Sequence, residues 1–215
     1  MLRTEGLENI SDGRKYKIND MVRADAGGCK GCSKCCETMS ETIILNPLDV
    51  FRMSRATKMS FESLIASGKI ELNMYDGIIL PNIKNNGSGC GFLLEGRCQI
   101  HSERPDICRL FPLGRVYEGD GFSYILQTGE CDKTKSKIKV KKWIGIENHE
   151  AYADFLMKWH GVVKTVREKV AFSAEGDGEP KKLLMTVLAF FYQMPYDLEA
   201  DFYEQFEDRL SKITI

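Results

Sequence analysis

The residues of this sequence best suited to chemistry are its eight cysteines. The first of them form the run Cys29-Lys-Gly-Cys32-Ser-Lys-Cys35-Cys36. A CxxC pair places two thiolates on one tight loop, and the extended CxxCxxC spacing places three sulfurs on a loop that wraps around a centre. This triple spacing resembles the loops of iron–sulfur clusters more than the separated CxxC pairs of structural zinc sites. The run therefore predicts a metal-binding loop.

The remaining cysteines are widely spaced and lie in turn-rich or strand-edge segments. Taken with the first run, they allow two tetrathiolate sites, one polynuclear site, or a single four-cysteine site with spare thiols, and spacing does not choose among these. Since adjacent side chains diverge, we expect one of Cys35 and Cys36 to serve a second site, bridge two metals or sit free. The candidate metal ligands are all eight: Cys29, Cys32, Cys35, Cys36, Cys90, Cys98, Cys108 and Cys131.

The expected redox state of these cysteines follows from the absence of an export signal. Residues 1–20 are polar and charged, without the apolar stretch of about 7–15 residues that a signal peptide requires. The most apolar segment, 183–194, is shorter than the ~20 residues of a membrane span. We therefore expect a cytoplasmic protein without a membrane segment, whose thiols stay reduced and serve as metal ligands rather than disulfides.

Basic residues are interleaved with the cysteines. A cluster held by four thiolates carries negative charge, so nearby cations should stabilise it. Lys30, Arg104 and Arg109 are the candidates for this role around the bound group. His101, three residues after Cys98, is a further candidate ligand or an orienting residue.

A second basic feature is the lysine run of 133–142, in which the charges alternate with period two. Such a run is typical of a solvated strand edge or loop, and the alternative is a basic edge that docks an acidic partner or nucleic acid. The net charge of −1 argues against a dedicated nucleic-acid binder. We therefore expect a protein partner or a larger complex, and no nucleic acid.

Length and composition describe an ordinary globular chain. It has 215 residues, of which 43% are apolar and 28% charged, enough to bury a core unaided. Composition divides it into a polar lead-in at 1–28, a cysteine-rich metal-binding domain at 29–131, and a helical region at 132–215 that packs on that domain.

The elements expected within these parts are short strands followed by longer helices. Turn residues bound the strands, capping residues and prolines open the early helices, and apolar steps of three and four mark the late ones. The predicted fold class is α+β: a small, turn-rich cysteine-cluster domain with short strands, packed against C-terminal α-helices. The expected strands are 42–45, 78–83, 91–94, 97–100 and 122–127, and the expected helices are 47–58, 61–67, 152–170, 179–193 and 198–210, with one helical turn between 102 and 112.

The ordered motifs resemble those of one family. After the run at 29–36 come Cys90-Gly-Phe-Leu, then Gly96-Arg-Cys98-Gln-Ile-His101, then Arg104-Pro105-x2-Cys108-Arg109-x-Phe111-Pro112. Over about residues 25–135 this series is similar to the YkgJ-type cysteine-cluster family, also called the CxxCxxCC zinc- or iron-chelating domain. The resemblance implies metal binding. It extends distantly to the flagellin lysine-N-methylase group, in which an iron–sulfur cluster is implicated.

These observations support one function and one alternative. The first is a protein that holds an iron–sulfur cluster, of the 4Fe-4S type, and acts in electron transfer or as the cluster-bearing subunit of a redox or methylating system. The alternative is a structural module that binds Zn2+ and mediates protein or nucleic-acid interaction. The sequence contains no Gly-rich nucleotide loop, P-loop, nucleophile elbow or HExxH. Catalytic residues are therefore unassigned, and whether the protein is an enzyme stays open.

Overall fold

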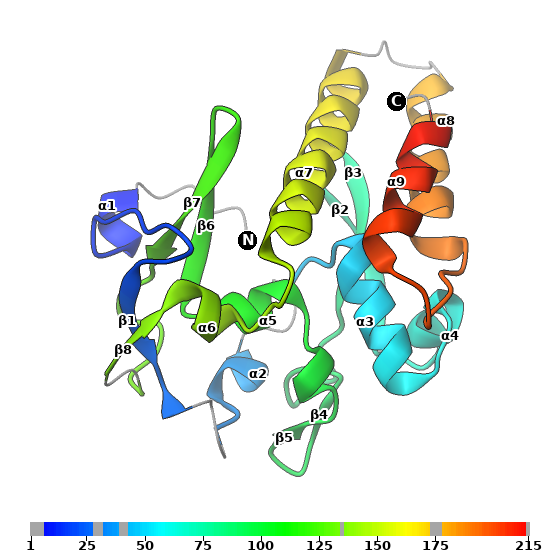
Figure 1. Ribbon diagram of the computed structural model, residues 1–215. Coiled ribbons are helices and arrows are strands. Elements are labelled where there is room, and N and C mark those ends of the chain that lie inside the picture. The colour runs from blue at the N-terminus through cyan, green and yellow to red at the C-terminus, as the bar shows by residue number, and fades with distance from the viewer. Residues whose placement is uncertain (1–6, 28–31, 39–42, 134–135, 173–177, 214–215) are drawn as a thin grey trace. The chain divides into compact units, whose positions relative to one another are not determined.

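The computed structural model describes residues 7–27, 32–38, 43–133, 136–172 and 178–213. The chain forms two compact units, each assembled from two separate stretches of sequence. Unit 1 contains residues 1–32 and 106–150, and unit 2 contains residues 33–105 and 151–215. Figure 1 shows the elements of both. The division of the chain at 28/29 and 131/132 was predicted from composition, and it stays a prediction.

Unit 1 consists of two antiparallel strand pairs and short helices. The strands β6 (Leu113–Glu118) and β7 (Gly121–Leu126) form a hairpin. Tyr16 extends this hairpin, because its backbone amide and carbonyl both bond with Tyr124, at 2.7 and 2.9 Å. The helices are α1 (Leu7–Ile10), α5 (Asp106–Leu110) and α6 (Val140–Ile144).

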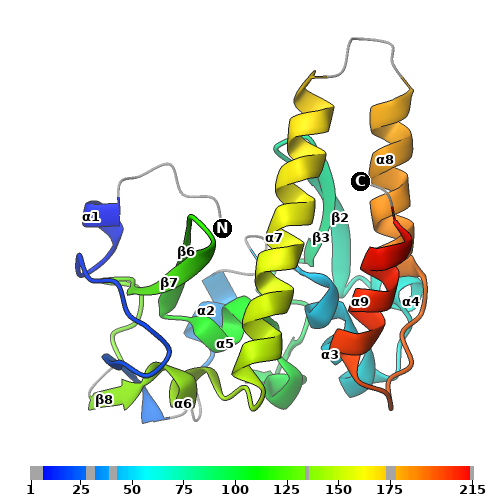
Figure 2. The same cartoon turned by 45° about the horizontal axis from the view of Figure 1, so that its top comes forward.

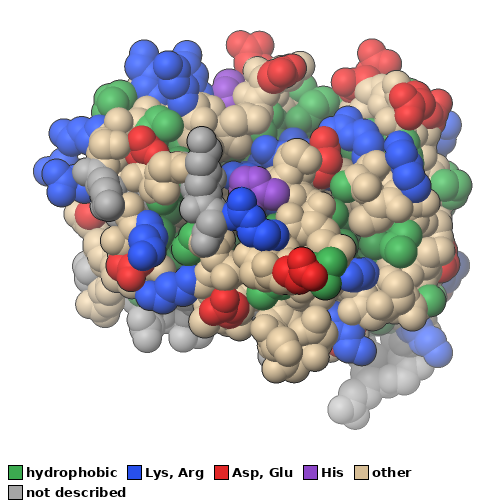
Figure 3. Space-filling view, turned by 90° about the horizontal axis from the view of Figure 1, so that it is seen from below, with side chains coloured by type: hydrophobic (Ala, Val, Ile, Leu, Met, Phe, Trp, Pro, Cys, Tyr) green, Lys and Arg blue, Asp and Glu red, His purple; other side chains and the backbone are tan. Residues whose placement is uncertain are grey.

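The second strand pair of unit 1 joins segments that are far apart in the sequence. Strand β1 (Met21–Asp25) lies antiparallel to β8 (Ser136–Lys139). Val22 and Ala24 of β1 are almost fully buried, whereas the alternate side chains are exposed, as the two-residue period of a strand requires. Figure 3 shows one face of the molecule, on which lysine and arginine side chains gather at the left.

Two buried polar contacts tie the elements of unit 1 together. The guanidinium of Arg115 on β6 forms an ion pair of 2.8 Å with Asp106 at the start of α5. Both side chains are at most 10% exposed. The indole N–H of Trp143 on α6 donates to the carbonyl of Leu110, the last residue of α5, at 3.1 Å. These contacts hold α5, and therefore its residue Cys108, against the rest of the unit.

Unit 2 begins with α2 (Lys34–Thr38) and continues through two capped helices, α3 (Pro47–Thr57) and α4 (Phe61–Ala66). Asn46 caps α3 in a reciprocal capping box with Asp49, and Ser60 caps α4, as expected from their positions. Next come the hairpin β2 (Ile70–Tyr75) with β3 (Ile78–Ile83), and the short pair β4 (Leu93–Leu94) with β5 (Arg97–Cys98). A single turn, η3 (His101–Glu103), follows.

The later helices of unit 2 supply most of its core. They are α7 (His149–Phe172), of which all but the first two residues belong to this unit, α8 (Glu179–Leu188), its π-helical continuation η4 (Ala189–Gln193), and α9 (Phe202–Lys212). In Figures 1 and 2, α7 runs beside the β2–β3 hairpin. Aromatic side chains of the later helices pack edge to face. Phe155 of α7 packs in this way on Phe206 of α9, with 4.8 Å between the ring centroids. The apolar residues at steps of three and four along α7 therefore form a packing surface.

The fold confirms the α+β prediction, with helices and short antiparallel strand pairs. The strand expected at 78–83 and the helices expected near 47 and 61 occupy those positions. The pair expected at 91–94 and 97–100 is shorter than predicted, with two residues in each strand. Strands β1, β2, β6 and β8 were not predicted. In the described part of the chain, no helix has both the length and the apolar content needed to cross a membrane.

Candidate metal centre

The two units divide the cysteines between them. Cys35 and Cys36 on α2, Cys90 before β4, and Cys98 on β5 belong to unit 2. Cys32, Cys108 and Cys131 belong to unit 1. Cys29 and Lys30 lie outside the described residues. All of the described cysteines are free thiols; Cys90 is buried and the others are half-buried.

Within unit 2, Ser33 initiates the short helix that carries the cysteine pair. Its carbonyl accepts hydrogen bonds from the amides of Cys36 and Glu37, at 2.8 and 3.1 Å. Its hydroxyl bonds to the Glu37 carboxylate at 2.6 Å. This turn is compact enough to place Cys35 and Cys36 next to a chain segment that arrives from far along the sequence.

That segment is the loop at 85–91. The amide of Cys90 donates a hydrogen bond of 2.7 Å to the carbonyl of Cys36. Gly89 makes this approach possible, since a Cβ at this position would lie 2.7 Å from the same carbonyl oxygen and 2.9 Å from Cα of Glu37. Asn85 shapes the loop by accepting from the amides of Gly87 and Gly89. A backbone contact therefore joins the first two cysteine motifs.

The β4–β5 hairpin positions Cys98. Its turn residues, Glu95 and Gly96, both have positive φ, and Cys98 lies opposite Leu93 in the register. The hairpin packs through Phe92, which is 1% exposed and whose amide donates to Sγ of Cys90 at 3.5 Å. The register thus carries Cys98 back toward the segment that holds Cys90.

The thiols of unit 2 contact one another. Cys36 hydrogen-bonds to both Cys35 and Cys98. The bond to Cys35 is the main cause that lowers the pKa of Cys35 to about 6. The bond to Cys98 is likewise the main cause that lowers the pKa of Cys98 to about 7. The pKa of Cys36 is raised because its proton is shared with these two sulfurs. Burial raises the pKa of Cys90. These hydrogen bonds therefore favour the thiolate forms of Cys35 and Cys98 and the protonated form of Cys36.

Positive charges surround this group. Arg104 further lowers the pKa values of Cys35 and Cys98, and Lys69 acts in the same direction on Cys90. The Arg104 guanidinium lies against the ring of His101, 3.1 Å from Nε2, and donates to that residue's carbonyl at 3.0 Å. Lys69 donates to the carbonyl of Gly91 at 2.6 Å. Both cations are therefore anchored where they stabilise sulfur anions.

The donor set fits a thiophilic metal. Sulfur ligands select zinc or iron rather than the hard cations magnesium and calcium, which prefer oxygen. In unit 2 the Cys36 thiol contacts the Cys35 thiol on one side and the Cys98 thiol on the other. Across the ranges that the structure describes, no three cysteine, histidine or acidic side chains form a ready-made group around one point.

Comparison with known proteins agrees with this chemistry. The family model CxxCxxCC, described as "Putative zinc- or iron-chelating domain", matches residues 28–142. The chain belongs to the CxxCxxCC family. This membership confirms the resemblance found in the sequence and supports metal binding. No solved structure matches the chain.

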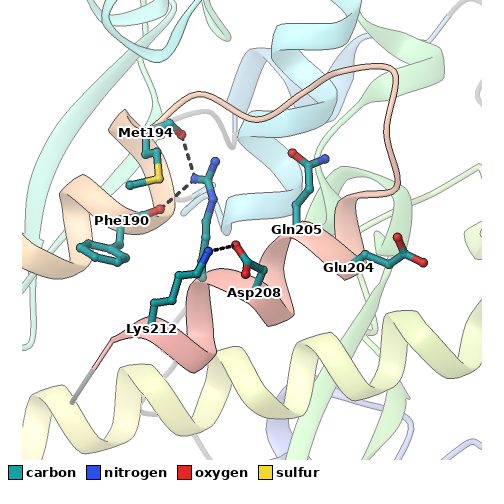
Figure 4. Close-up of a pocket in the computed structure, with 7 residues that line it drawn as sticks. Phe190, Met194, Glu204, Gln205, Asp208 and Lys212 are labelled. Carbon is teal, nitrogen blue, oxygen red and sulfur yellow. Dashed lines mark hydrogen bonds and ion pairs between the residues drawn. The ribbon is translucent and has the colours of Figure 1, made fainter.

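Outside the cysteines, the described part of unit 2 contains a cavity of about 540 Å3 between η4 and α9. Three of the four charged side chains in its wall, those of Asp208, Arg209 and Lys212, serve the fold. Arg209 donates to the carbonyls of Phe190 and Met194, and Asp208 pairs with Lys212, as the dashed lines in Figure 4 show. Because these three side chains already have partners within the chain, the cysteines of this CxxCxxCC protein remain the candidate site.

The structure adds residues to the site that sequence reasoning missed. Gly89 and Asn85 lie in the segment Asn-Asn-Gly-Ser-Gly, whose residue types are typical of a turn but do not reveal its contact with Cys36. Lys69 gave no sequence signal, because it reaches the site only through the fold of β2 and β3. Arg109 lies next to Cys108 on α5 in unit 1, and its role near a metal stays a prediction.

Proposed function

We propose that this CxxCxxCC protein holds an iron–sulfur cluster through cysteine thiolates, and that it acts in electron transfer or as the cluster-bearing subunit of a redox or methylating system. The observation that carries the proposal is the contact of the Cys36 thiol with those of Cys35 and Cys98, next to a backbone hydrogen bond to Cys90. A cubane cluster takes four cysteine thiolates. Three separate chain segments of unit 2 would supply them, and Cys35 and Cys36 would both take part, because their side chains are hydrogen-bonded to each other and do not diverge as expected of adjacent residues.

The charges favour an anionic centre. Arg104 and Lys69 stabilise thiolates at Cys35, Cys98 and Cys90, and hydrogen bonds and charges near the sulfurs are among the factors that set the reduction potential of such clusters. The bound cluster would supply one-electron chemistry. The protein would supply the half-buried sulfur ligands and the cations that balance their charge.

The unit 1 cysteines belong to the same proposal. The proposed ligands of any further metal are Cys32, Cys108 and Cys131, together with Cys29. Cys108 lies on α5, which the Arg115–Asp106 ion pair and the Trp143 hydrogen bond hold in place. Whether these thiols carry a second centre is a matter of metal stoichiometry, which the experiment below measures.

The alternative function is a structural zinc module that mediates interaction with a protein or nucleic acid. One observation favours it: β4 and β5 are two residues long, and a closed tetrathiolate zinc site is a common way to fold such a loop-rich segment. In that case the metal would be redox-inactive, and its removal would unfold the hairpin.

Anaerobic purification with measurement of iron, sulfide and zinc distinguishes the two functions. The iron–sulfur proposal predicts a brown protein with absorbance near ~400 nm and about four irons and four sulfides per cluster. A colourless protein with stoichiometric zinc would establish the alternative instead. Absence of any bound metal after reconstitution with iron and sulfide, or with zinc, would contradict both.

Variants then locate the centre. Cys36→Ser and Cys98→Ser should each lose most of the metal held by unit 2. Met74→Ser is the matched control, because it also removes a sulfur from unit 2 but at a side chain that is 61% exposed on β2. Cys131→Ser reports on unit 1, and a loss of metal there with the unit 2 share retained would indicate two centres.

A further inference from the structure

Within the lysine run, strand β8 (Ser136–Lys139) contributes to an exposed basic surface in unit 1. Strand β8 pairs with β1 in the register Met21 to Lys139 and Val22 to Ile138. Directly opposite residues of an antiparallel pair share a face of the sheet. Val22, which is 1% exposed, therefore fixes the inner face, and Met21 and Lys139 lie on the outer one.

A bulge adds charge to this outer face. The register shifts between Val22 and Asp25 on β1, so that two residues, Arg23 and Ala24, lie opposite the single residue Lys137. Ala24 is fully buried and Arg23 is exposed. Residues two apart on a strand lie about 7 Å from each other. We call the exposed set of Met21, Arg23, Lys137 and Lys139 the ribbon face.

The cations of the ribbon face are not neutralised within the described chain. The side chains of Arg23, Lys137 and Lys139 make no hydrogen bond or ion pair with any described residue. The Asp25 carboxylate accepts from the Ser136 hydroxyl and from the Gly27 amide, both at 2.9 Å. Like charges on opposite strands repel one another, and an anionic partner would remove that repulsion.

The composition of the surface and of the chain favours a protein over a nucleic acid. Met21 is 48% exposed beside the cations, and methionine and arginine are both enriched at protein–protein interfaces. The net charge is −1 and the isoelectric point about 6.3, whereas nucleic-acid-binding domains are strongly basic as a whole. A local basic patch on a nearly neutral chain is suited to an acidic patch of similar size.

We propose that the ribbon face docks an acidic surface of a protein partner. Lys137, Lys139 and Arg23 would pair with carboxylates of the partner, and Met21 would supply an apolar contact among them. Charge complementarity of this kind governs association rate and specificity, and it weakens with ionic strength. The proposal stands on unit 1 alone and does not depend on which metal the cysteines hold.

The test measures the affinity of the full-length, metal-loaded protein for fluorescently labelled poly-L-glutamate, by anisotropy at low and at physiological salt. The reversal variant Lys137→Glu/Lys139→Glu is compared with the matched control Lys164→Glu/Lys181→Glu. The control makes the same change in charge at exposed lysines on α7 and α8 of unit 2. Circular dichroism and metal content verify that both variants are folded and loaded.

We expect salt-dependent binding that falls roughly tenfold in the ribbon variant and less than twofold in the control. Equal losses in the two variants would overturn the proposal, because binding would then reflect net charge alone. Failure of the wild-type protein to bind at low salt would also overturn it. Tighter binding to a single-stranded DNA of equal charge, lost in the ribbon variant, would overturn the assignment to a protein partner in favour of nucleic acid.

Discussion

The backbone of Cys90 donates a 2.7 Å hydrogen bond to the carbonyl of Cys36, and this contact joins cysteine motifs that are 54 positions apart in the printed sequence. It places a buried thiol next to the helix that carries Cys35 and Cys36. The cysteine group of unit 2 therefore depends on a backbone approach as well as on its sulfur atoms.

Replacing Gly89 with alanine should disrupt this approach. The new Cβ would lie 2.7 Å from the Cys36 carbonyl oxygen, at a φ of +121°, so we expect a loss of about 2–4 kcal/mol in the free energy of unfolding. Gly87→Ala is the control, because its φ is also positive, at +88°, but nothing lies within 4 Å, and its cost should be about 1 kcal/mol. Urea denaturation measures both, and equal costs would contradict the steric explanation.

The hydrogen bonds among the thiols should make Cys35 and Cys98 more reactive toward alkylation in the metal-free protein. Thiolates are the nucleophiles, and the pKa values of Cys35 and Cys98 are lowered to about 6 and about 7. Alkylation of these two by iodoacetamide, followed by peptide mass mapping, should therefore be fast at pH 8 and fall as pH drops through 7 to 6. Cys36→Ala removes the donor and should shift the alkylation profile to higher pH. An unchanged profile would rule out Cys36 as the cause.

Removing one member of the buried ion pair in unit 1 should be costly. Asp106→Ala leaves Arg115, whose side chain is 10% exposed, without its carboxylate, and we expect a loss of about 3–5 kcal/mol. The exposed pair of Lys15 and Glu118 gives the control, since Glu118→Ala should cost less than about 1 kcal/mol. The comparison is made by thermal and urea denaturation. A similar small cost for both variants would show that the Arg115 charge becomes hydrated in the mutant.

Arg209 should stabilise the end of the π-helical segment η4. Its guanidinium donates to the carbonyls of Phe190 and Met194 at 2.8 Å (Figure 4) and to that of Pro195 at 2.7 Å. Arg209→Met retains apolar bulk but leaves these carbonyls without their donor, and should cost about 3 kcal/mol. Lys212→Met on the same helix removes only an exposed pair with Asp208. The control should change stability by less than about 0.5 kcal/mol.

Part of the fold was predictable because its signals are local. Asn46 and Ser60 cap helices with their own neighbours three residues on, and the apolar steps along α7 identify its buried face without reference to a partner. Strand β3 matched because its residues are apolar and turn residues bound it. In each case the deciding interaction lies within a few residues of sequence.

Two of the missed strands, β1 and β8, are stabilised by a distant partner, whereas the other two, β2 and β6, form local hairpins with β3 and β7. Strand β1 has exposed Met21 and Arg23 and pairs with a lysine-rich strand more than a hundred residues away. Strand β1 had no strand signal of its own, and the lysine run that contains β8 indicated only a solvated strand edge or a loop. The burial of Val22 and Ala24 stabilises the pairing. The basic ribbon face is a consequence of that pairing.

The sequence by itself determined the candidate ligands and their chemistry, because thiols at CxxCxxCC spacing suit thiophilic metals in any fold that brings them together. Only the tertiary structure decided the grouping: Cys35, Cys36, Cys90 and Cys98 share unit 2, and Cys32, Cys108 and Cys131 lie in unit 1. The physical reason is that contact between Cys36 and Cys98 depends on a glycine without a Cβ, a two-residue hairpin register and a buried phenylalanine. The spacing of the cysteines along the chain contains no information about these three features.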